Sequence, residues 1–289
     1  MFEKILIPTD FSKYSQKVLE CVTDLPGVKE VVLLHVIAQA DHLARIRDFG
    51  SSIQESKEKL AELKNALESR NLSVKTIAEA ITEGDISEAI QKVADEEKIS
   101  LIAMGARGKS IVEGIFLGNV AKNILRFGNT NILLLRYAVL EGREGPNLEN
   151  ICPQLYSKVL CPIDFSISSA QALEFIKEIG GVEEIILLHV IVRGETWGEI
   201  NTSKEEADKK LMAMSDDFQR AGIRVKTYTS VGHPEKEICD LARKENVSLI
   251  AMSSHGKDWL KQLMIGSTTY EVTRLADRPV LVIKSVQMF

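Results

Sequence analysis

Short apolar runs alternate with stretches of helical periodicity along the whole chain. The runs cover residues 4–8, 31–37, 73–78, 99–104 and 131–136, and then residues 158–162, 185–191, 224–229, 247–252 and 279–284. Most of them are apolar at every position, which is typical of strands in a parallel sheet that is covered on both faces. The pattern therefore predicts α/β domains in which strands and helices alternate along the chain.

The same pattern occurs twice. Residues 4–12 (KILIPTDFS) match residues 158–166 (KVLCPIDFS), and residues 31–37 match residues 185–191, both at an offset of 154 residues. The offset falls to 151 at residue 74 and to 148 at residue 99, so the second copy is shorter in two loops. A repeat of this length indicates a duplicated domain rather than a solenoid unit.

We therefore predict two domains, residues 1–139 and 157–289, each a three-layer sandwich around a mostly parallel five-stranded sheet of the Rossmann type. Residues 140–156 have no counterpart in the repeat and contain glycine and proline, as expected for a linker. The fifth strands, residues 131–136 and 279–284, are apolar on both faces. An exposed edge of this kind favours pairing, so we expect the two domains to form an internal pseudo-dimer through these strands, with a further homodimer left open.

Composition narrows the class of protein. The chain has 289 residues, 45% of them hydrophobic, and its 36 Lys+Arg against 41 Asp+Glu give a net charge of −5. This weak acidic balance argues against binding to nucleic acid by phosphate neutralisation. No apolar run approaches the roughly 18–20 residues that a bilayer span needs, and the first residues lack the pattern of a signal peptide. We expect a cytoplasmic protein with no membrane partner.

The four cysteines do not suggest a metal site. No C-x-x-C pair occurs, and no histidine lies at zinc-ligand spacing from a cysteine. Cys21, Cys161 and Cys239 fall in apolar segments and are interpreted as small core residues, whereas Cys152 lies in the predicted linker. Metal catalysis therefore has no support in the sequence.

Polar residues follow the first and second strands of each copy. Asp10 and Asp164 come directly after the first strands, and the sequence leaves two interpretations open: a turn former, or an acceptor for an adenine amine or a ribose hydroxyl. His35 and His189 end the second strands and are interpreted as interior residues rather than catalytic ones. In such sheets, ligands bind beyond the carboxyl ends of the strands, where the strand order reverses.

The segment after the fourth strand carries the strongest signal. It reads M-G-A-R-G at residues 104–108, followed by nine residues and Gly118, and its copy reads M-S-S-H-G at 252–256, followed by nine residues and Gly266. Glycines let backbone N–H groups approach phosphate oxygens, and the last glycine opens a helix whose amino end favours an anion. A complete P-loop, a G-x-G-x-x-G fingerprint after the first strand and a G-x-S-x-G elbow are all missing, which argues against NAD binding and serine hydrolysis.

With P-x-D at the first strand, this spacing resembles the ATP-binding branch of the universal stress proteins, in the tandem form, over nearly all of both repeats. The resemblance implies the adenine nucleotide alpha-hydrolase-like fold. The nucleotide-binding residues that it and the two loops indicate are Pro8, Thr9, Asp10, Val36, Met104, Gly105, Arg107, Gly108, Gly118, Asn119 and Val120 in the first copy, and Pro162, Ile163, Asp164, Val190, Met252, Ser253, His255, Gly256, Gly266, Ser267 and Thr268 in the second. Asn119 and Ser253 depart from the family pattern, which has Ser or Thr and Gly there.

The expected function is binding of ATP or AMP at two pseudo-equivalent sites in a regulatory or stress-response protein, with Mg²⁺ as a companion if ATP is the ligand. No catalytic residue and no metal ligand is predicted, so the protein is not expected to be an enzyme, although weak ATPase activity is left open. The alternatives are a slow Mg²⁺-dependent ATPase and a nucleotide-free interaction scaffold.

Overall fold

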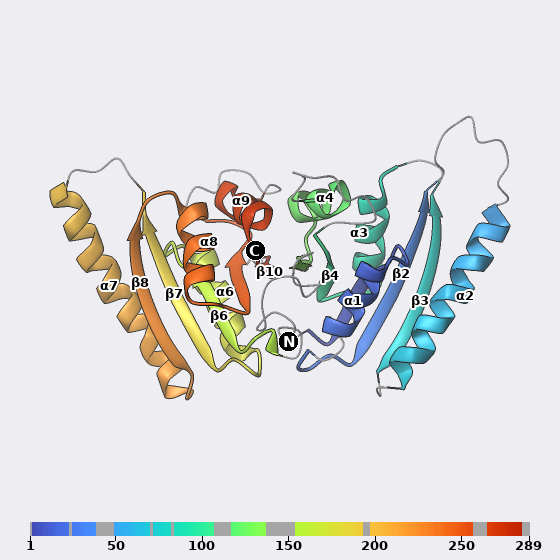
Figure 1. Cartoon of the computed structure of the whole chain (residues 1–289), viewed down its shortest axis with the longest axis horizontal. Helices are drawn as coiled ribbons and strands as arrows, with labels where there is room; N and C mark the ends of the chain where they lie inside the picture. The colour runs from blue at the N-terminus through green and yellow to red at the C-terminus, as the bar shows by residue number, and fades with distance from the viewer. Residues whose placement is uncertain are drawn as a thin grey trace. The chain divides into compact units, whose positions relative to one another are not determined.

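The computed structural model describes residues 2–22, 25–38, 49–69, 72–81, 84–106, 117–136, 154–192, 197–256 and 265–284. The chain forms two compact units, Met1–Glu141 and Gly142–Phe289 (Figure 1). No helix in the described ranges is long and apolar enough to cross a membrane.

The first unit alternates strands and helices, as the sequence predicts. Its elements are β1 (Lys4–Pro8), α1 (Lys13–Val22), β2 (Glu30–Ala38), α2 (Phe49–Glu68), β3 (Ser73–Ile81), α3 (Ile86–Glu96), β4 (Leu101–Gly105), α4 (Asn119–Phe127) and β5 (Asn131–Leu135). The strand order is β3-β2-β1-β4-β5, and these neighbours pair in parallel.

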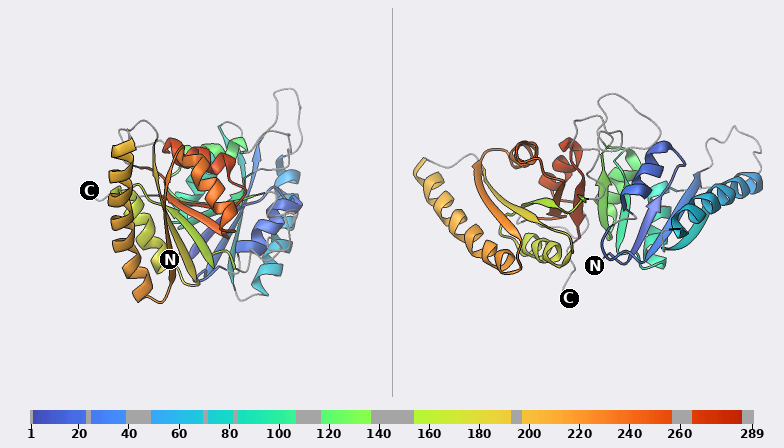
Figure 2. Two further views of the ribbon diagram at one scale, coloured as in Figure 1. Left: turned by 60° about the vertical axis from the view of Figure 1, so that its left-hand side comes forward. Right: turned by 60° about the horizontal axis from the view of Figure 1, so that its bottom comes forward.

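The second unit repeats this arrangement. Its elements are β6 (Lys158–Pro162), α6 (Ile167–Glu178), β7 (Glu184–Ile191), α7 (Trp197–Arg220), β8 (Arg224–Val231), α8 (Pro234–Lys244), β9 (Leu249–Ser253), α9 (Ser267–Leu275) and β10 (Val280–Ile283). The order β8-β7-β6-β9-β10 is again parallel, and helices cover both faces of each unit's sheet (Figure 2). The predicted α/β class is confirmed, whereas pairing of the units through β5 and β10 stays a prediction.

The order of the strands fixes where a ligand can bind. In each unit the first strand, β1 or β6, lies between the second and the fourth, so the chain leaves it toward one side and returns on the other. This reversal opens a crevice at the carboxyl ends of the strands. The sheet beneath it is rigid, because the central strands are fully buried: Ile5, Leu6 and Ile7 in β1 are each 0% exposed.

The cysteines differ from one another in a way that the sequence does not reveal. Cys161 and Cys239 are free and buried, as expected, and burial raises the pKa of the Cys161 thiol. Cys21 is also buried, as expected of a core residue, but it is disulfide-bonded, which the sequence analysis does not predict. Cys152 lies outside the described residues.

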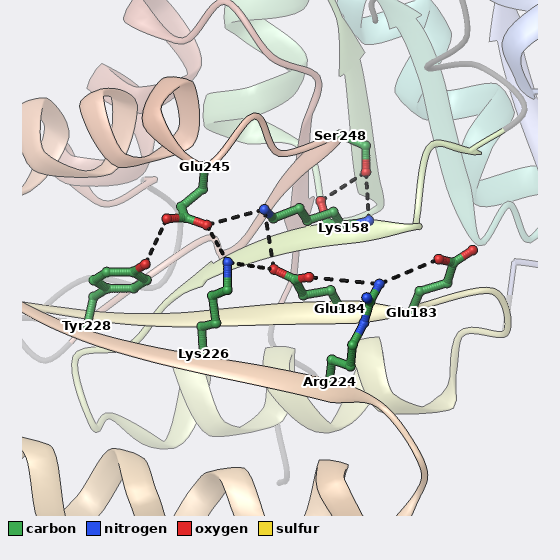
Figure 3. Close-up of polar contacts among 8 residues, drawn as sticks. All are labelled: Lys158, Glu183, Glu184, Arg224, Lys226, Tyr228, Glu245 and Ser248. Carbon is green, nitrogen blue, oxygen red and sulfur yellow. Dashed lines mark hydrogen bonds and ion pairs between the residues drawn. The ribbon is translucent and has the colours of Figure 1, made fainter.

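A cluster of charged side chains ties together the amino ends of the strands in the second unit (Figure 3). Lys158, which begins β6, forms ion pairs with Glu184 of β7 at 3.3 Å and with Glu245 at 3.2 Å, and Lys226 of β8 contacts the same two carboxylates. The Tyr228 hydroxyl donates to Glu245 at 2.7 Å. This network lies at the edge of the sheet opposite the crevice.

The first unit contains the equivalent network. Lys4 pairs with Glu30 at 3.1 Å and with Glu97 at 3.0 Å, and Lys75 pairs with Glu97 at 2.6 Å. Hydrogen bonds from Lys75 and Lys4 hold the pKa of Glu97 below its ordinary value. The lysines and glutamates of this cluster thus lie at matching positions in the two units.

Candidate functional site

A pocket of about 800 Å³ lies at the carboxyl ends of the strands in the second unit. Its lining includes every residue that the sequence predicts for the second copy, namely Pro162, Ile163, Asp164, Val190, Met252, Ser253, His255, Gly256, Gly266, Ser267 and Thr268. These residues come from the ends of β6, β7 and β9 and from the first turn of α9. The fold thus brings together side chains that are about a hundred residues apart in the chain.

Asp164 connects two sides of this pocket. Its Oδ1 accepts the backbone N–H of Ser166 at 3.0 Å, which closes the turn between β6 and α6. Its Oδ2 faces Gly256, since a Cβ built on Gly256 would lie 2.4 Å from that oxygen. The carboxylate therefore forms the local turn and also lies against the glycine loop, and only glycine fits at position 256 without displacing it.

The residue after this aspartate has an unusual backbone conformation in both copies. Phe165 has a φ of 60° and Phe11 a φ of 59°, in the left-handed region that residues with a side chain rarely adopt. The Phe165 ring lies 4.5 Å from the His189 ring, and Phe11 lies 4.4 Å from His35, measured between centroids. Strained conformations of this kind persist where the surroundings hold them in place, often near binding sites.

The histidine that follows the buried part of the second strand is hydrogen-bonded to the first strand in both copies. Nδ1 of His189 lies 2.7 Å from the Ile163 carbonyl oxygen, and Nδ1 of His35 lies 2.7 Å from the Thr9 carbonyl oxygen. A carbonyl only accepts, so Nδ1 is the donor in both cases. This contact holds the segment that presents Asp10 or Asp164. Both histidines are half-buried and His189 lines the pocket, so their interpretation as interior residues stays a prediction.

The glycine loop of the second unit is held by its own side chains. Ser253 Oγ donates to the His255 carbonyl at 2.6 Å, and Thr269 Oγ1 donates to the Ser253 carbonyl at 2.9 Å. The backbone N–H of Gly266 donates to the Ser254 carbonyl at 2.8 Å. Ser253, which replaces the first glycine of the pattern, therefore orders the loop through its hydroxyl group.

The amino end of α9 is suited to an anion. Gly266 is its N-cap and no side chain caps the helix there, in contrast to α6, where Ser166 accepts a hydrogen bond from the Ser169 N–H. The amide groups of an uncapped first turn and the helix dipole together favour a negatively charged group. The pocket thus combines an anion-favouring helix end with a carboxylate at Asp164.

The first unit has the same framework as far as the structure describes it. Pro8 ends β1 and is followed by Thr9 and Asp10, and Asp10 Oδ1 accepts the Ser12 N–H at 3.0 Å. Val36 lies in β2. The remaining first-copy residues lie at β4 and α4: Met104 and Gly105 end the strand, Gly118 is the uncapped N-cap, and Asn119 and Val120 open the helix. Arg107 and Gly108 lie outside the described residues.

The sequence analysis does not predict several residues that line the pocket. Phe165 and Thr269 line the pocket, as do Ser203, Glu206 and Lys210 of α7. Phe165 has a signal in the sequence, because the repeated D-F-S segment contains it in both copies. The α7 residues have no motif of their own, and only the packing of the helix places them beside the pocket.

Valine at the two N-cap glycines is expected to remove nucleotide binding without unfolding the protein. Gly118 and Gly266 have φ values of −70° and −61°, so backbone strain does not contribute. A Cβ at Gly266 would make ordinary contacts, the nearest at 3.5 Å from the Ser254 carbonyl oxygen, but a branched side chain would extend into the approach to the α9 amides. Titration of the folded Gly118→Val/Gly266→Val protein should detect no bound nucleotide, with circular dichroism as the check on folding. Unchanged stoichiometry would refute the assignment of both loops.

The fold and the pocket together define a class of protein: a doubly wound α/β domain, present twice, with a ligand pocket where the strand order reverses. The sequence profile described as "Universal stress protein family" matches residues 1–136 and 155–284. The chain belongs to the universal stress protein family, in its tandem form.

Relatives show how the two repeats correspond to known proteins. A universal stress protein of Methanocaldococcus jannaschii is 36% identical over 155 residues, covering 45% of this chain and 96% of the relative. A Bacillus subtilis universal stress protein is 28% identical over 148 residues, covering 45% and 100%. Each of these relatives thus has the length of one repeat. A crystal structure of a universal stress protein from Archaeoglobus fulgidus covers 97% of this chain and 96% of its own, with 28% identity and a TM-score of 0.72.

Proposed function

We propose that the chain binds adenine nucleotides, ATP or AMP, at one site in each unit and acts as a regulatory protein of the stress response. The observation that carries this proposal is the convergence in the second unit of Asp164, the glycine loop and the uncapped amino end of α9 on one pocket. Membership of the family supports the same role, because the match extends over both repeats.

Each part of the pocket has a chemical role in this proposal. The first-turn amides of α9, from Ser267 onward, hold phosphate oxygens. Gly256 allows the loop backbone to lie against Asp164, whose carboxylate accepts hydrogen bonds from the ribose or the base. The backbone of Val190, at the end of β7, contacts the base. In the first unit, Asp10, Val36 and Gly118 have the equivalent positions.

Two adenine nucleotides are expected to bind to each chain. Calorimetric titration with ATP and with AMP measures the stoichiometry, and chromatography of an acid extract identifies any nucleotide that is retained through purification. A ligand that binds only the folded state should also raise the free energy of unfolding by about 2.7 kcal/mol at a hundredfold excess over its dissociation constant. A stoichiometry near zero, with an empty extract, would overturn the proposal.

We further propose that the site binds the nucleotide without hydrolysing it. Asp164, a carboxylate of the pocket, already accepts the Ser166 N–H as part of a turn, an arrangement suited to holding a ligand rather than to moving a proton. Magnesium would enter together with ATP, bound to its phosphates. Phosphate release that depends on Mg²⁺ and disappears in the Gly118→Val/Gly266→Val protein would show instead that the sites hydrolyse ATP.

A further inference from the structure

Helices α2 and α7 occupy matching positions in the two repeats, and few of their residues are identical. At the offset of 151 residues, the twenty residues of α2 and the matching part of α7 share four identities: Ser52 with Ser203, Glu55 with Glu206, Lys59 with Lys210, and Leu60 with Leu211. Leu60 and Leu211 are 1% and 0% exposed, so packing in the core explains their retention. In the first unit, Glu55 and Lys59 form an exposed ion pair at 2.6 Å, one helical turn apart. Exposed pairs of this kind contribute only roughly 0–1 kcal/mol, so the retained glutamate and lysine call for a further explanation.

The three polar residues lie on one face of the helix. They are spaced at i, i+3 and i+7, which places them in a row along the helix axis. In the second unit all three line the pocket, although Glu206 and Lys210 are exposed to solvent. Their exposed neighbours Glu205 and Lys209 do not line it, and the first copy has Gln54 and Glu58 at those two positions. Polar residues are thus retained where they face the pocket and exchanged where they face solvent.

The lysine also contacts the loop that presents Asp164. Its Nζ lies 5.2 Å from the centroid of the Phe165 ring, and Lys59 lies 5.6 Å from the Phe11 ring. The phenylalanine ring therefore has both a lysine and a histidine ring close to it in each copy. The face of an aromatic ring and a nearby cation attract each other electrostatically. The lysine therefore helps to hold the left-handed turn next to the aspartate.

The position of α7 in the fold indicates which part of a ligand it faces. The helix packs on β7 and β8, whereas the glycine loop follows β9. Strands β7 and β9 lie on opposite sides of β6, so the two regions are roughly 10 Å apart at the usual strand spacing. With phosphates at the α9 amino end, the base of the nucleotide lies at the α7 side of the pocket.

We propose that Glu206 and Lys210 of α7, with Glu55 and Lys59 of α2 as their counterparts, form the wall of each site that recognises the adenine base. This inference rests on the proposed nucleotide binding and adds the residues that select the base. Glu206 accepts a hydrogen bond from the exocyclic amine. Lys210 is a positioning residue: it holds Phe165 and, through it, the turn that carries Asp164.

Comparison of ATP with inosine triphosphate tests the role of the glutamate, because the inosine base has an oxo group in place of the amine. In the Glu55→Ala/Glu206→Ala protein, ATP should bind about tenfold more weakly while inosine triphosphate binding changes little, since one hydrogen bond to a charged group is lost. The matched control, Glu58→Ala/Glu205→Ala, removes two exposed carboxylates from the same helices and should keep the preference of the wild type.

The outcomes of this titration separate the two proposals. If the wild type binds no nucleotide, the proposed function is refuted, and the inference about base recognition is refuted with it. If the wild type binds ATP, and the Glu55→Ala/Glu206→Ala protein prefers ATP over inosine triphosphate as strongly as the control does, only the recognition wall is refuted.

A second pair of variants tests the positioning role of the lysine. Lys59→Met/Lys210→Met should weaken ATP and inosine triphosphate alike, by about two- to fivefold, because the loss acts through the aspartate turn rather than through the base. Arginine at both positions keeps a cation over the ring and should restore binding, and Lys57→Met/Lys209→Met is the control. Unchanged affinity in the methionine protein, or no rescue by arginine, would refute this role.

Discussion

The Gly256→Ala variant is expected to lose nucleotide from the second unit while keeping its fold. A Cβ at this position would lie 2.4 Å from Asp164 Oδ2, closer than atoms can approach, so the short aspartate side chain must rotate away. Its carboxylate would then no longer be placed to accept a hydrogen bond from the ligand. Because a hydrogen bond to a charged group contributes about 1.5–3 kcal/mol, affinity at this site should fall about ten- to a hundredfold, as measured by calorimetry.

Two other glycines serve as controls for this substitution. A Cβ at Gly266 would have no neighbour closer than 3.5 Å, and one at Gly198 in α7 would have none within 4 Å. Alanine at Gly266 should therefore be accommodated with little loss of stability, and alanine at Gly198 should leave binding unchanged and slightly favour the helix. If Gly256→Ala binds as tightly as Gly198→Ala, Asp164 does not contact the nucleotide.

The second large effect is expected on stability, from Glu245→Gln in the charged cluster of Figure 3. The hydrogen bond from Lys226, and then that from Tyr228, lowers the pKa of Glu245 from 4.5 to about 2. A shift of this size corresponds to about 3 kcal/mol, an upper limit because solvent screens part of the interaction. Chemical denaturation at pH 7 should show the variant to be less stable than the wild type by up to that amount.

The pH dependence of this difference follows from the direction of the shift. Because the folded state lowers the pKa, the stabilisation is fully present above pH 4.5 and is lost as the pH falls toward 2. The stabilities of wild type and Glu245→Gln should therefore converge on acidification. If the difference in stability between the wild type and Glu245→Gln stayed constant from pH 7 to pH 2, this explanation would be wrong.

Glu183 provides a matched control for this measurement. It pairs only loosely with Arg224, at 3.8 Å, and its side chain is 69% exposed, in contrast to 12% for Glu245. Exposed ion pairs of this kind contribute roughly 0–1 kcal/mol. Glu183→Gln should therefore leave both the stability at pH 7 and its pH dependence nearly unchanged.

The apolar runs predict all ten strands, but polar residues at the strand ends are not predicted. Strand β2 begins at Glu30, where the carboxylate pairs with Lys4, and β8 extends through Ser230 to Val231. In the other direction, β4 begins at Leu101 rather than at residue 99, because the Ile99 N–H donates to the Ala94 carbonyl and completes the end of α3. The start of β2 depends on Lys4, which is distant in the sequence, and the start of β4 depends on a helix-ending hydrogen bond. The pattern of apolar residues records neither of these interactions.

The residues of the candidate site also fall into those that the sequence predicts and those that it does not. A motif records an aspartate at a strand end and glycines where the backbone is approached closely, so Asp164, Gly256 and Gly266 could be predicted. Glu206 and Lys210 could not, because an exposed helix residue shows its role only when the helix is placed over the pocket. The left-handed backbone of Phe165 could not be predicted either, since residue propensity disfavours it and its contacts with His189 and Lys210 appear only in the folded structure.

Cys161 and Cys239 are the free thiols among the described residues, and their burial makes them reporters of local opening in the second unit. Cys161 lies in β6 and Cys239 in α8, each 3% exposed, so a thiol reagent gains access only when the surrounding elements separate. Their labelling rates thus follow the breathing of the sheet and of the helix that covers it, without any introduced probe. A ligand bound at the carboxyl ends of β6 and β9 would slow that breathing, so the labelling rates of Cys161 and Cys239 report occupancy of the pocket in this unit.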